Sequence, residues 1–215
     1  MSPTKSDAAT HSLLSGIRVV GRRDFLFAGA GLAAGACLPA TAALAEMATS
    51  VAKPAQEVSD KDREFMTLAL KQMRQAGVLD KTGGPFGAVV VHDGKILATA
   101  GNSVMRDNDP SAHAEVNAIR AACRKVGNPH IVDAVLYSSC EPCPMCYSTA
   151  YWARVGKIFY AASWTDYADL FDDSNIAKDM SFPYEQRQVA LQQIMQPDAQ
   201  KVWEEFRRLP DRARY

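Results

Sequence analysis

Apolar and polar residues recur with two periods along the chain, and these periods predict the order of its helices and strands. From Ser59, apolar side chains return every three or four residues and predict an amphipathic helix that fades at Gly77. Ser59 or Asp60 is suited to cap its first turn, because either side chain can accept a backbone hydrogen bond there. The apolar positions of this helix are Phe65, Leu68, Ala69 and Met73.

A β-hairpin is predicted next. Residues 86–91 form a continuous apolar run, which is typical of a buried strand, and residues 96–100 form the return strand. Asp93-Gly94 lies between them and is a strong signal for a tight hairpin turn. The sheet is therefore expected to begin with an antiparallel pair.

Helices and strands then alternate. A helix is predicted over residues 112–126, with Ser111 as a candidate cap, and a strand over residues 134–138. A second helix is predicted over residues 143–153, and a further strand over residues 155–162. This order predicts an α/β domain, in which a mixed sheet with parallel pairs is flanked by helices.

The residues after position 163 give weaker patterns. Residues 164–179 fit a loop or a short helix, and residues 188–194 fit either a strand or a helix. Residues 199–209 show the apolar spacing of a helix.

Composition places the chain among globular proteins. Its 215 residues are 47% hydrophobic and 22% charged, which is too apolar for a disordered chain. Lys and Arg together number 24, as do Asp and Glu, so the net charge is zero and a strongly basic nucleic-acid binder is disfavoured. The five cysteines are too few for a small disulfide scaffold.

The first 45 residues have the features of a targeting segment. Residues 25–45 carry no charge, follow the pair Arg22-Arg23 and end in small residues, so cleavage is predicted between Ala45 and Glu46. The paired arginines resemble those of a twin-arginine export signal. A membrane anchor is the alternative, but the apolar stretch before Pro39 has only about fifteen residues, whereas a spanning helix needs roughly 20.

These features divide the chain into a twin-arginine-type signal peptide (1–45), a flexible tether (46–59) and a folded domain (60–215). The mature protein is expected to be exported or periplasmic, without a stable membrane anchor. Without residues 1–45 the chain keeps 20 basic and 22 acidic side chains, a net charge of −2.

Two short motifs lie at the predicted starts of two helices: His113-x-Glu115 and Pro142-Cys143-x-x-Cys146. The two cysteines are three residues apart, so a first helical turn can place both sulfurs on one side. The positive helix end favours thiolates, and His113 can supply a third ligand. Three protein ligands leave one tetrahedral position open for water, which is the catalytic form of a zinc site.

Glu115 supplies the remaining group that this chemistry needs. It lies two residues from a ligand and can move the proton of a zinc-activated water without binding the metal. A lone histidine could instead be a helix cap, and a lone C-x-x-C could be a disulfide or redox pair. Both halves together match the signature of zinc-dependent nucleobase deaminases. Cys140 precedes the helix and is expected to be structural.

The sequence resembles the cytidine-deaminase-like superfamily, and within it the bacterial guanine deaminases, over about residues 62–215. Residues 171–174, Phe-Asp-Asp-Ser, and the terminal Tyr215 are more particular to guanine deaminases than the zinc motif is. The other stretches that carry the resemblance are residues 83–89, 108–116, 139–146 and 151–154.

This resemblance implies a three-layer sandwich fold, a Zn²⁺ cofactor and a substrate pocket. Asn102 is implied to hydrogen-bond the purine, and Ala114 to offer its backbone N–H at the pocket floor. Phe86 and Trp152 are implied to pack on the base, and Asp173 to contact the amino edge of the substrate. A homodimer is also implied, since the C-terminal segment is swapped between two subunits in some relatives.

The predicted function is hydrolytic deamination of guanine to xanthine and ammonia, with Glu115 as the proton shuttle. The same chemistry on cytosine, a pterin or an aminotriazine remains an alternative. So does tRNA-adenosine deamination, although the net charge of −2 and the export signal argue against a nucleic-acid partner. A non-catalytic zinc-binding module is the alternative from another class, and it would not require Glu115.

Overall fold

The computed structural model describes residues 57–213. The predicted signal peptide, the predicted tether up to residue 56 and the terminal Tyr215 lie outside the described residues. Within residues 57–213, every helix is too short or too polar to cross a lipid bilayer.

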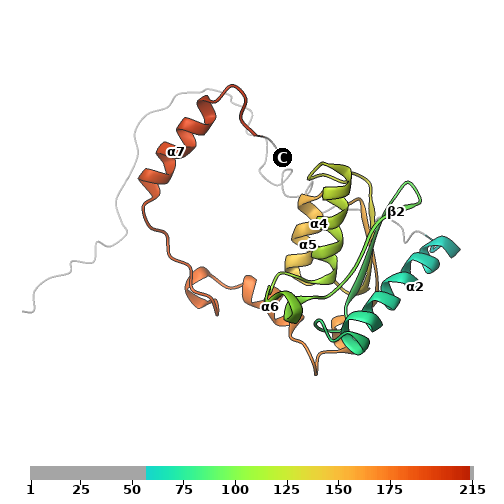
Figure 1. Ribbon diagram of the computed structural model, residues 1–215. Coiled ribbons are helices and arrows are strands. Elements are labelled where there is room, and N and C mark those ends of the chain that lie inside the picture. The colour runs from blue at the N-terminus through green and yellow to red at the C-terminus, as the bar shows by residue number, and fades with distance from the viewer. Residues whose placement is uncertain (1–56, 214–215) are drawn as a thin grey trace, which may run out of the picture. The chain divides into compact units, whose positions relative to one another are not determined.

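A mixed sheet forms the centre of the domain (Figure 1). The strand order is β2-β1-β3-β4, with β1 antiparallel to both of its neighbours and β3 parallel to β4. The predicted mixed sheet with a leading hairpin is therefore confirmed. The strands are β1 (Gly87–His92), β2 (Lys95–Gly101), β3 (Val135–Cys140) and β4 (Lys157–Ala162).

The hairpin turn follows from two residues. Asp93 and Gly94 both have positive φ, 49° and 71°, as a two-residue turn between strongly twisted strands requires. A bulge between Val90 and Val91 then shifts the register of the two strands.

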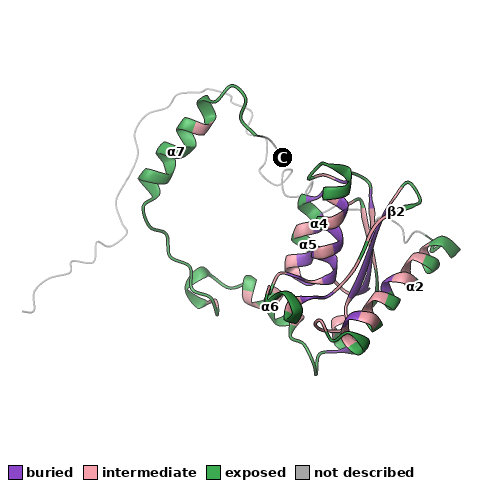
Figure 2. Ribbon diagram, in the orientation of Figure 1, coloured by how far each residue is buried: buried purple, intermediate pink, exposed green. Residues whose placement is uncertain are grey.

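Helices cover both faces of the sheet (Figure 1). Helix α2 (Asp60–Arg74) packs on one face, and α4 (Ala114–Val126) packs on the other beside α5 (Pro144–Trp152). The buried residues concentrate in the sheet and on the inner sides of α4 and α5 (Figure 2). This arrangement is the predicted three-layer α/β sandwich.

The face under α2 holds a polar contact among aromatic rings. The Tyr137 hydroxyl donates to Asp62 at 2.5 Å, while its ring stacks on Phe159 and tilts against Phe65. Burial raises the pKa of Tyr137, and the hydrogen bond to Asp62 raises it further. Asp62 also closes a capping box with Ser59, so Ser59 is the N-cap of α2.

Two predicted helix boundaries differ from the structure, and one short helix was not predicted. The first helix does not end at Gly77 but continues through a π-helical turn, Gln75–Leu79. Helix α4 begins at Ala114, since His113 is its N-cap and Ser111 instead donates to Asp109. A short helix, α3 (Val104–Asp107), lies between β2 and α4, where the sequence predicted no helix.

The C-terminal residues are mostly exposed. Residues 188–194 form neither a helix nor a strand, whereas α7 (Gln196–Arg208) matches the last predicted helix within three residues. Tyr167 is the one buried residue within the described range 154–213. The other elements here are η3 (Trp164–Asp166), α6 (Asp173–Met180) and η4 (Tyr184–Gln186).

Candidate active site

Two helix N-termini bring the predicted metal ligands together. His113 is the N-cap of α4, Cys143 is the N-cap of α5, and Cys146 lies in the first turn of α5. The ligand atoms of these three residues all lie within 4.8 Å of one another. The His113 Nδ1 atom is 3.7 Å from the Cys143 sulfur and 3.6 Å from the Cys146 sulfur.

The proton distribution within this cluster favours a thiolate. The thiol of Cys146 donates to Cys143 and, together with His113, lowers the pKa of Cys143 to about 4 despite its burial. The same contact and burial raise the pKa of Cys146. The contact with Cys143 raises the pKa of His113. The cluster thus favours a thiolate at Cys143, which is the form of cysteine that binds a metal.

The donor set fits zinc. Two cysteine sulfurs and one imidazole nitrogen are ligands that zinc prefers, and three protein ligands are typical of a catalytic site. Cys140, which is also buried, lies outside the cluster, as the sequence predicted.

Glu115 lies beside the cluster as a buried carboxylate. Its exposed fraction is 4%, and burial raises its pKa above the usual range. One oxygen accepts a hydrogen bond from the Ser138 hydroxyl at 3.0 Å, and the other is 3.5 Å from the Cys146 sulfur. These contacts fix the carboxylate within reach of the space beside the three ligands.

The loop that carries Asn102 is tied to the rest of the site through its backbone. The Thr82 hydroxyl donates to the Asn102 carbonyl at 2.7 Å, and the Ser103 N–H donates to the Ala112 carbonyl, next to His113. The Asn102 side chain is buried, and its Oδ1 accepts from the Val104 N–H at 3.1 Å.

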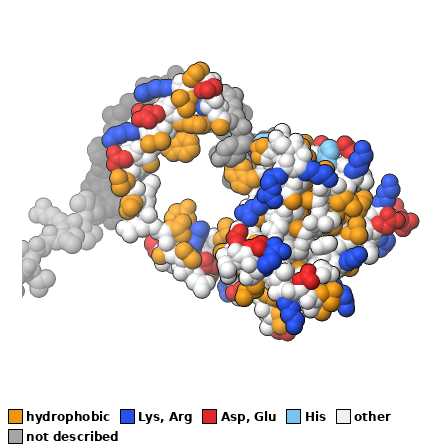
Figure 3. Space-filling model, in the orientation of Figure 1, with side chains coloured by type: hydrophobic (Ala, Val, Ile, Leu, Met, Phe, Trp, Pro, Cys, Tyr) orange, Lys and Arg blue, Asp and Glu red, His pale blue; other side chains and the backbone are white. Residues whose placement is uncertain are grey.

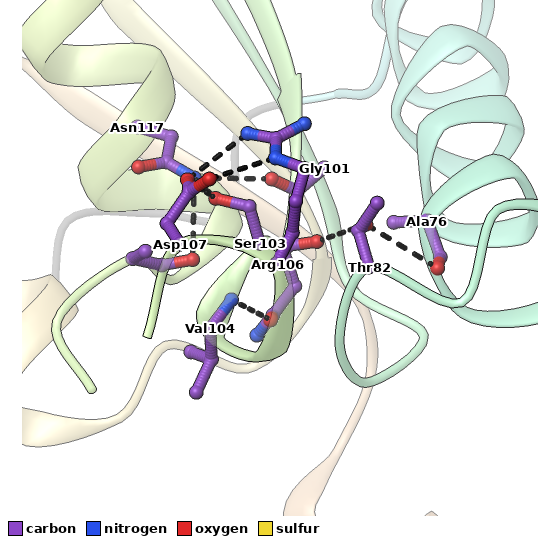
Figure 4. A network of polar contacts seen from close by, with 10 residues as sticks. Ala76, Thr82, Gly101, Ser103, Val104, Arg106, Asp107 and Asn117 are labelled. Atoms are coloured by element: carbon purple, nitrogen blue, oxygen red, sulfur yellow. Dashed lines mark hydrogen bonds and ion pairs between the residues drawn. The ribbon is translucent and has the colours of Figure 1, made fainter. Parts of the chain in front are cut away.

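A polar network on α4 holds this loop in place (Figure 4). The side-chain amide of Asn117 donates to Ser103 Oγ at 3.0 Å and to the carbonyls of Gly101 and Ala112 at 3.2 Å each. Ser103 in turn donates to Asp107 at 2.6 Å. Hydrogen bonds from Arg106 and Ser103 lower the pKa of Asp107 to about 2.

Gly83 provides the room that Asn102 needs. A Cβ atom built on Gly83 would lie 1.9 Å from the Asn102 Oδ1 atom, a separation that no real structure allows. The glycine of this loop is therefore required by the close approach of the Asn102 amide.

Three aromatic rings and the carboxylate of Asp173 contact one another near the cluster. Phe86 packs edge-on against Phe171 and Tyr167, with ring centroids 5.0 Å and 5.6 Å apart. The Tyr167 hydroxyl donates to Asp173 at 3.2 Å. Burial raises the pKa of Asp173, and the negative charge of Cys143 raises it further. The charge of Asp173 also acts on the pKa of His113.

The two remaining predicted substrate contacts, Ala114 and Trp152, lie at different distances from the metal ligands. Ala114 is buried at the first position of α4, where its N–H has no acceptor within the helix. Trp152 lies at the opposite end of α5 from Cys143 and Cys146, and is 56% exposed. Its ring contacts Tyr151 edge-on and lies under the guanidinium of Arg154. The structure therefore groups Ala114, but not Trp152, with the metal ligands.

Sequence reasoning did not find Ser138, Asn117 or Tyr167. Two polar residues in a run that otherwise reads as a buried strand, Ser138-Ser139, were a usable signal for Ser138. Asn117 lies one helical turn after His113, which is a weaker signal. Nothing local to Tyr167 in the sequence indicates its contact with Asp173.

Comparison with known proteins defines the class of this site. Residues 59–162 match the family model for the cytidine and deoxycytidylate deaminase zinc-binding region. The chain is 46% identical to guanine deaminase of Bacillus subtilis (strain 168) over 140 residues, which are 65% of this chain and 90% of that protein. The chain therefore belongs to the family of zinc-dependent, cytidine-deaminase-like deaminases.

Two further comparisons refine this placement. The X-ray structure of guanine deaminase from Bacillus subtilis matches with a TM-score of 0.68 and 42% identity, over 71% of this chain and 98% of that one. A tRNA-specific adenosine deaminase of Agrobacterium fabrum (strain C58) is 43% identical over 98 residues, 46% of this chain and 63% of that protein. The protein is an enzyme of the zinc-dependent deaminase class with Zn²⁺ as its cofactor, so the predicted fold, enzyme class and metal are confirmed.

Proposed function

We propose that the protein is a guanine deaminase, which hydrolyses guanine to xanthine and ammonia. The observation that carries this proposal is the arrangement of a buried carboxylate, Glu115, beside the ligand cluster, with Asp173 close enough to act on the pKa of His113. The similarity to guanine deaminase of Bacillus subtilis, which extends over 90% of that protein, supports the choice of substrate.

In the proposed site, His113, Cys143 and Cys146 hold the zinc. Zinc bound there lowers the pKa of a water molecule from 15.7 to about 7 and so supplies a nucleophile at neutral pH. The water oxygen adds to the ring carbon that bears the amino group, and that carbon loses ammonia.

Glu115 moves the protons of this reaction. Its carboxylate accepts a proton from the attacking water and delivers it to the ring nitrogen next to the reacting carbon. It then takes the second proton from the added oxygen and delivers it to the departing amino group, which leaves as ammonia. The hydrogen bond from Ser138 holds one oxygen of Glu115, so the other is oriented toward the reacting atoms.

The other residues position the base. Asn102 hydrogen-bonds the purine, Ala114 offers its N–H at the pocket floor, and Phe86 packs on the ring. Asp173 accepts hydrogen bonds from the amino edge, where a carboxylate is complementary to N–H donors. For Trp152, whose ring is remote from the ligands of its own chain, a contact with the base would have to be made across a subunit interface.

An ammonia-release assay on guanine, adenine, cytosine and an aminotriazine tests the substrate. Guanine is expected to give the highest kcat/KM. Glu115→Gln should keep zinc and fold but lose at least about 10²-fold in kcat, the lower end for general acid–base catalysis. No release from guanine would contradict the substrate, and near-normal turnover of Glu115→Gln would contradict the shuttle.

One observation favours a second candidate, tRNA-adenosine deamination. The chain is 43% identical to the tRNA-specific enzyme of Agrobacterium fabrum, but it covers only 63% of that protein. Inosine formation in a tRNA substrate, with no activity on free guanine, would select this alternative.

We also propose that the protein is a homodimer in which the C-terminal segment, residues 188–208, packs on the partner subunit. Hydrophobic side chains are exposed on α7 (Figure 3). Trp203 is 59% exposed, and the preceding extended residues Val189 and Ile194 are 73% and 74% exposed. Apolar side chains exposed to this degree in one segment are typical of an interface.

The receiving surface in this proposal lies beside β4. This strand ends the four-stranded sheet of the described residues, so its outer edge is open to an added strand. An apolar groove of about 430 Å³ lies next to it, lined by residues that include Tyr147, Ile158, Tyr160 and Trp164.

We further propose that residues 1–45 direct the enzyme out of the cytoplasm by the twin-arginine route. The support is the order of charged, apolar and small residues in the sequence. Such export suits an enzyme that folds around its metal before it is moved.

A further inference from the structure

Tyr167 is buried within a segment that is otherwise exposed. Its exposed fraction is 9%, whereas all other residues from 165 to 172 are exposed. A large side chain that is buried within an exposed segment packs against the residues on the inner side of that segment. Here Tyr167 contacts Phe86, Phe171 and Asp173, and two of these, Phe86 and Asp173, are proposed substrate contacts.

The segment that carries Tyr167 is fixed at its start. Ser163 and Asp166 form a capping box on the short helix η3. The indole N–H of Trp164 donates to the Glu141 carbonyl at 2.9 Å, and the Trp164 backbone N–H donates to the Glu141 carboxylate at 3.3 Å. Glu141 lies two residues before the ligand Cys143. The contacts of Trp164 therefore connect the segment that carries Tyr167 to the segment that carries this ligand.

The segment is also fixed after Tyr167. The Tyr167 carbonyl accepts from the N–H groups of Leu170 and Phe171, at 2.9 Å and 3.1 Å, which closes a tight turn. The rings of Tyr167 and Phe171 meet edge-on, with centroids 6.3 Å apart, and both contact Phe86. The Tyr167 ring therefore has little freedom to rotate away from α6.

The hydroxyl of this fixed ring reaches the first residue of α6. It donates to Oδ2 of the half-buried Asp173 at 3.2 Å. A hydrogen bond on one carboxylate oxygen restricts rotation of the carboxylate and leaves the other oxygen to accept from a ligand. Burial raises the pKa of Tyr167, so the phenol remains a donor at neutral pH.

We propose that Tyr167 is a positioning residue for the substrate, which orients the Asp173 carboxylate toward the amino edge of the base. This inference rests on the proposed function, because it assumes that Asp173 contacts the substrate. Tyr167 itself does not touch the reacting atoms; it acts through Asp173.

A packing role alone is the competing explanation. If the Tyr167 ring only fills space between Phe86 and Phe171, its hydroxyl is dispensable and Tyr167→Phe retains full activity. The two explanations therefore differ in what removal of a single oxygen atom does, and in whether that effect depends on Asp173.

A double-mutant cycle on kcat/KM for guanine separates them. Tyr167→Phe is expected to lower kcat/KM by about 10-fold, the lower end for loss of a hydrogen bond to a charged group. In the Asp173→Ala background the same change should alter kcat/KM by less than about 2-fold, because contacting residues that act as a unit are not additive. Tyr184→Phe, which changes an exposed tyrosine, is the matched control and should be silent.

Thermal unfolding gives a readout without substrate. It is measured on the four proteins of the cycle: the wild type, Tyr167→Phe, Asp173→Ala and the double variant. Tyr167→Phe should lower the melting temperature in the native background and less in the Asp173→Ala background, with zinc content unchanged. An unchanged kcat/KM in Tyr167→Phe, or an equal loss in both backgrounds, would overturn the proposal.

The outcome for the proposed function is separate. If the wild-type protein does not deaminate guanine, that function is wrong, and the cycle is repeated with the amino-heterocycle that the ammonia assay identifies. Coupling between Tyr167 and Asp173 on that substrate supports the positioning role, and independent effects refute it.

Discussion

At the scale of single residues, the two thiols and the imidazole of the metal cluster contact one another, and these contacts change the pKa of each group. The lowered pKa of Cys143 favours a thiolate at the N-terminus of α5. Zinc binding completes this arrangement by removing the proton that Cys146 retains.

The purified protein is accordingly expected to hold about one zinc per chain. Cys143→Ala and Cys146→Ala should each weaken zinc binding by more than about 10²-fold, since even residues that only support a ligand cost about 10–100-fold. Metal analysis after dialysis against a chelator measures this. Cys123→Ala, which changes a cysteine outside the cluster, should keep its metal, and full zinc retention by both ligand variants would refute the assignment.

The residues that the sequence predicted and those that it missed differ in how local their signal is. His113, Glu115 and the two cysteines stand in short motifs at helix starts, so spacing alone groups them. Ser138 contacts Glu115 from 23 positions away, and nothing in the spacing between them specifies that contact. Such partners are set by the register of β3 beside α4, which only the folded chain defines.

At the scale of elements, α4 connects the ligand His113 with the loop that carries Asn102. Asn117 makes this connection, with one amide group close to two carbonyls and a hydroxyl. Side-chain amides can satisfy several acceptors that a helix and a strand end leave open.

Asn117→Ala is expected to destabilise the protein by about 1–3 kcal/mol, because buried acceptors lose their donor. It should also raise KM for the substrate, because the Asn102 loop is no longer held to α4. Urea unfolding and steady-state kinetics measure the two effects. Asn175→Ala, in exposed α6, is the control, and a variant indistinguishable from it would show that the network does not support the loop.

Element boundaries were predictable where a local signal dominates. The Asp93-Gly94 turn and the Ser59 cap appear where the sequence places them. Helix α4 starts two residues later than predicted, because His113 stays extended and Ser111 bonds to Asp109. For residues 188–194 no local pattern decides the structure, and a segment exposed in this way takes its conformation from what covers it.

At the scale of the whole molecule, the exposed apolar residues of the C-terminal segment lead to a prediction about assembly. The wild-type protein should be a dimer by light scattering. Trp203→Asp should shift it toward monomer, because an apolar ring at an interface is replaced by a charge. Glu204→Gln, on the polar side of the same helix, should remain dimeric. A monomeric wild-type protein would contradict the proposed interface.

The proposed export is the remaining prediction for the whole chain, and it rests on the sequence of residues 1–45. The pair Arg22-Arg23 stands directly before an uncharged stretch that ends in small residues, and recognition of a twin-arginine signal depends on that pair. Lys at both positions keeps the positive charge but loses the planar, multiply donating guanidinium groups.

We therefore expect Arg22→Lys with Arg23→Lys to leave most of the protein unprocessed in the cytoplasm, while Arg18→Lys, in the same region, is processed normally. Cell fractionation with detection of the full-length and cleaved forms measures the outcome. If the protein folds around zinc before export, as proposed, the retained protein should still be an active deaminase, which separates a defect in export from a defect in folding. Unchanged appearance of the double variant outside the cytoplasm would show that another route carries the protein.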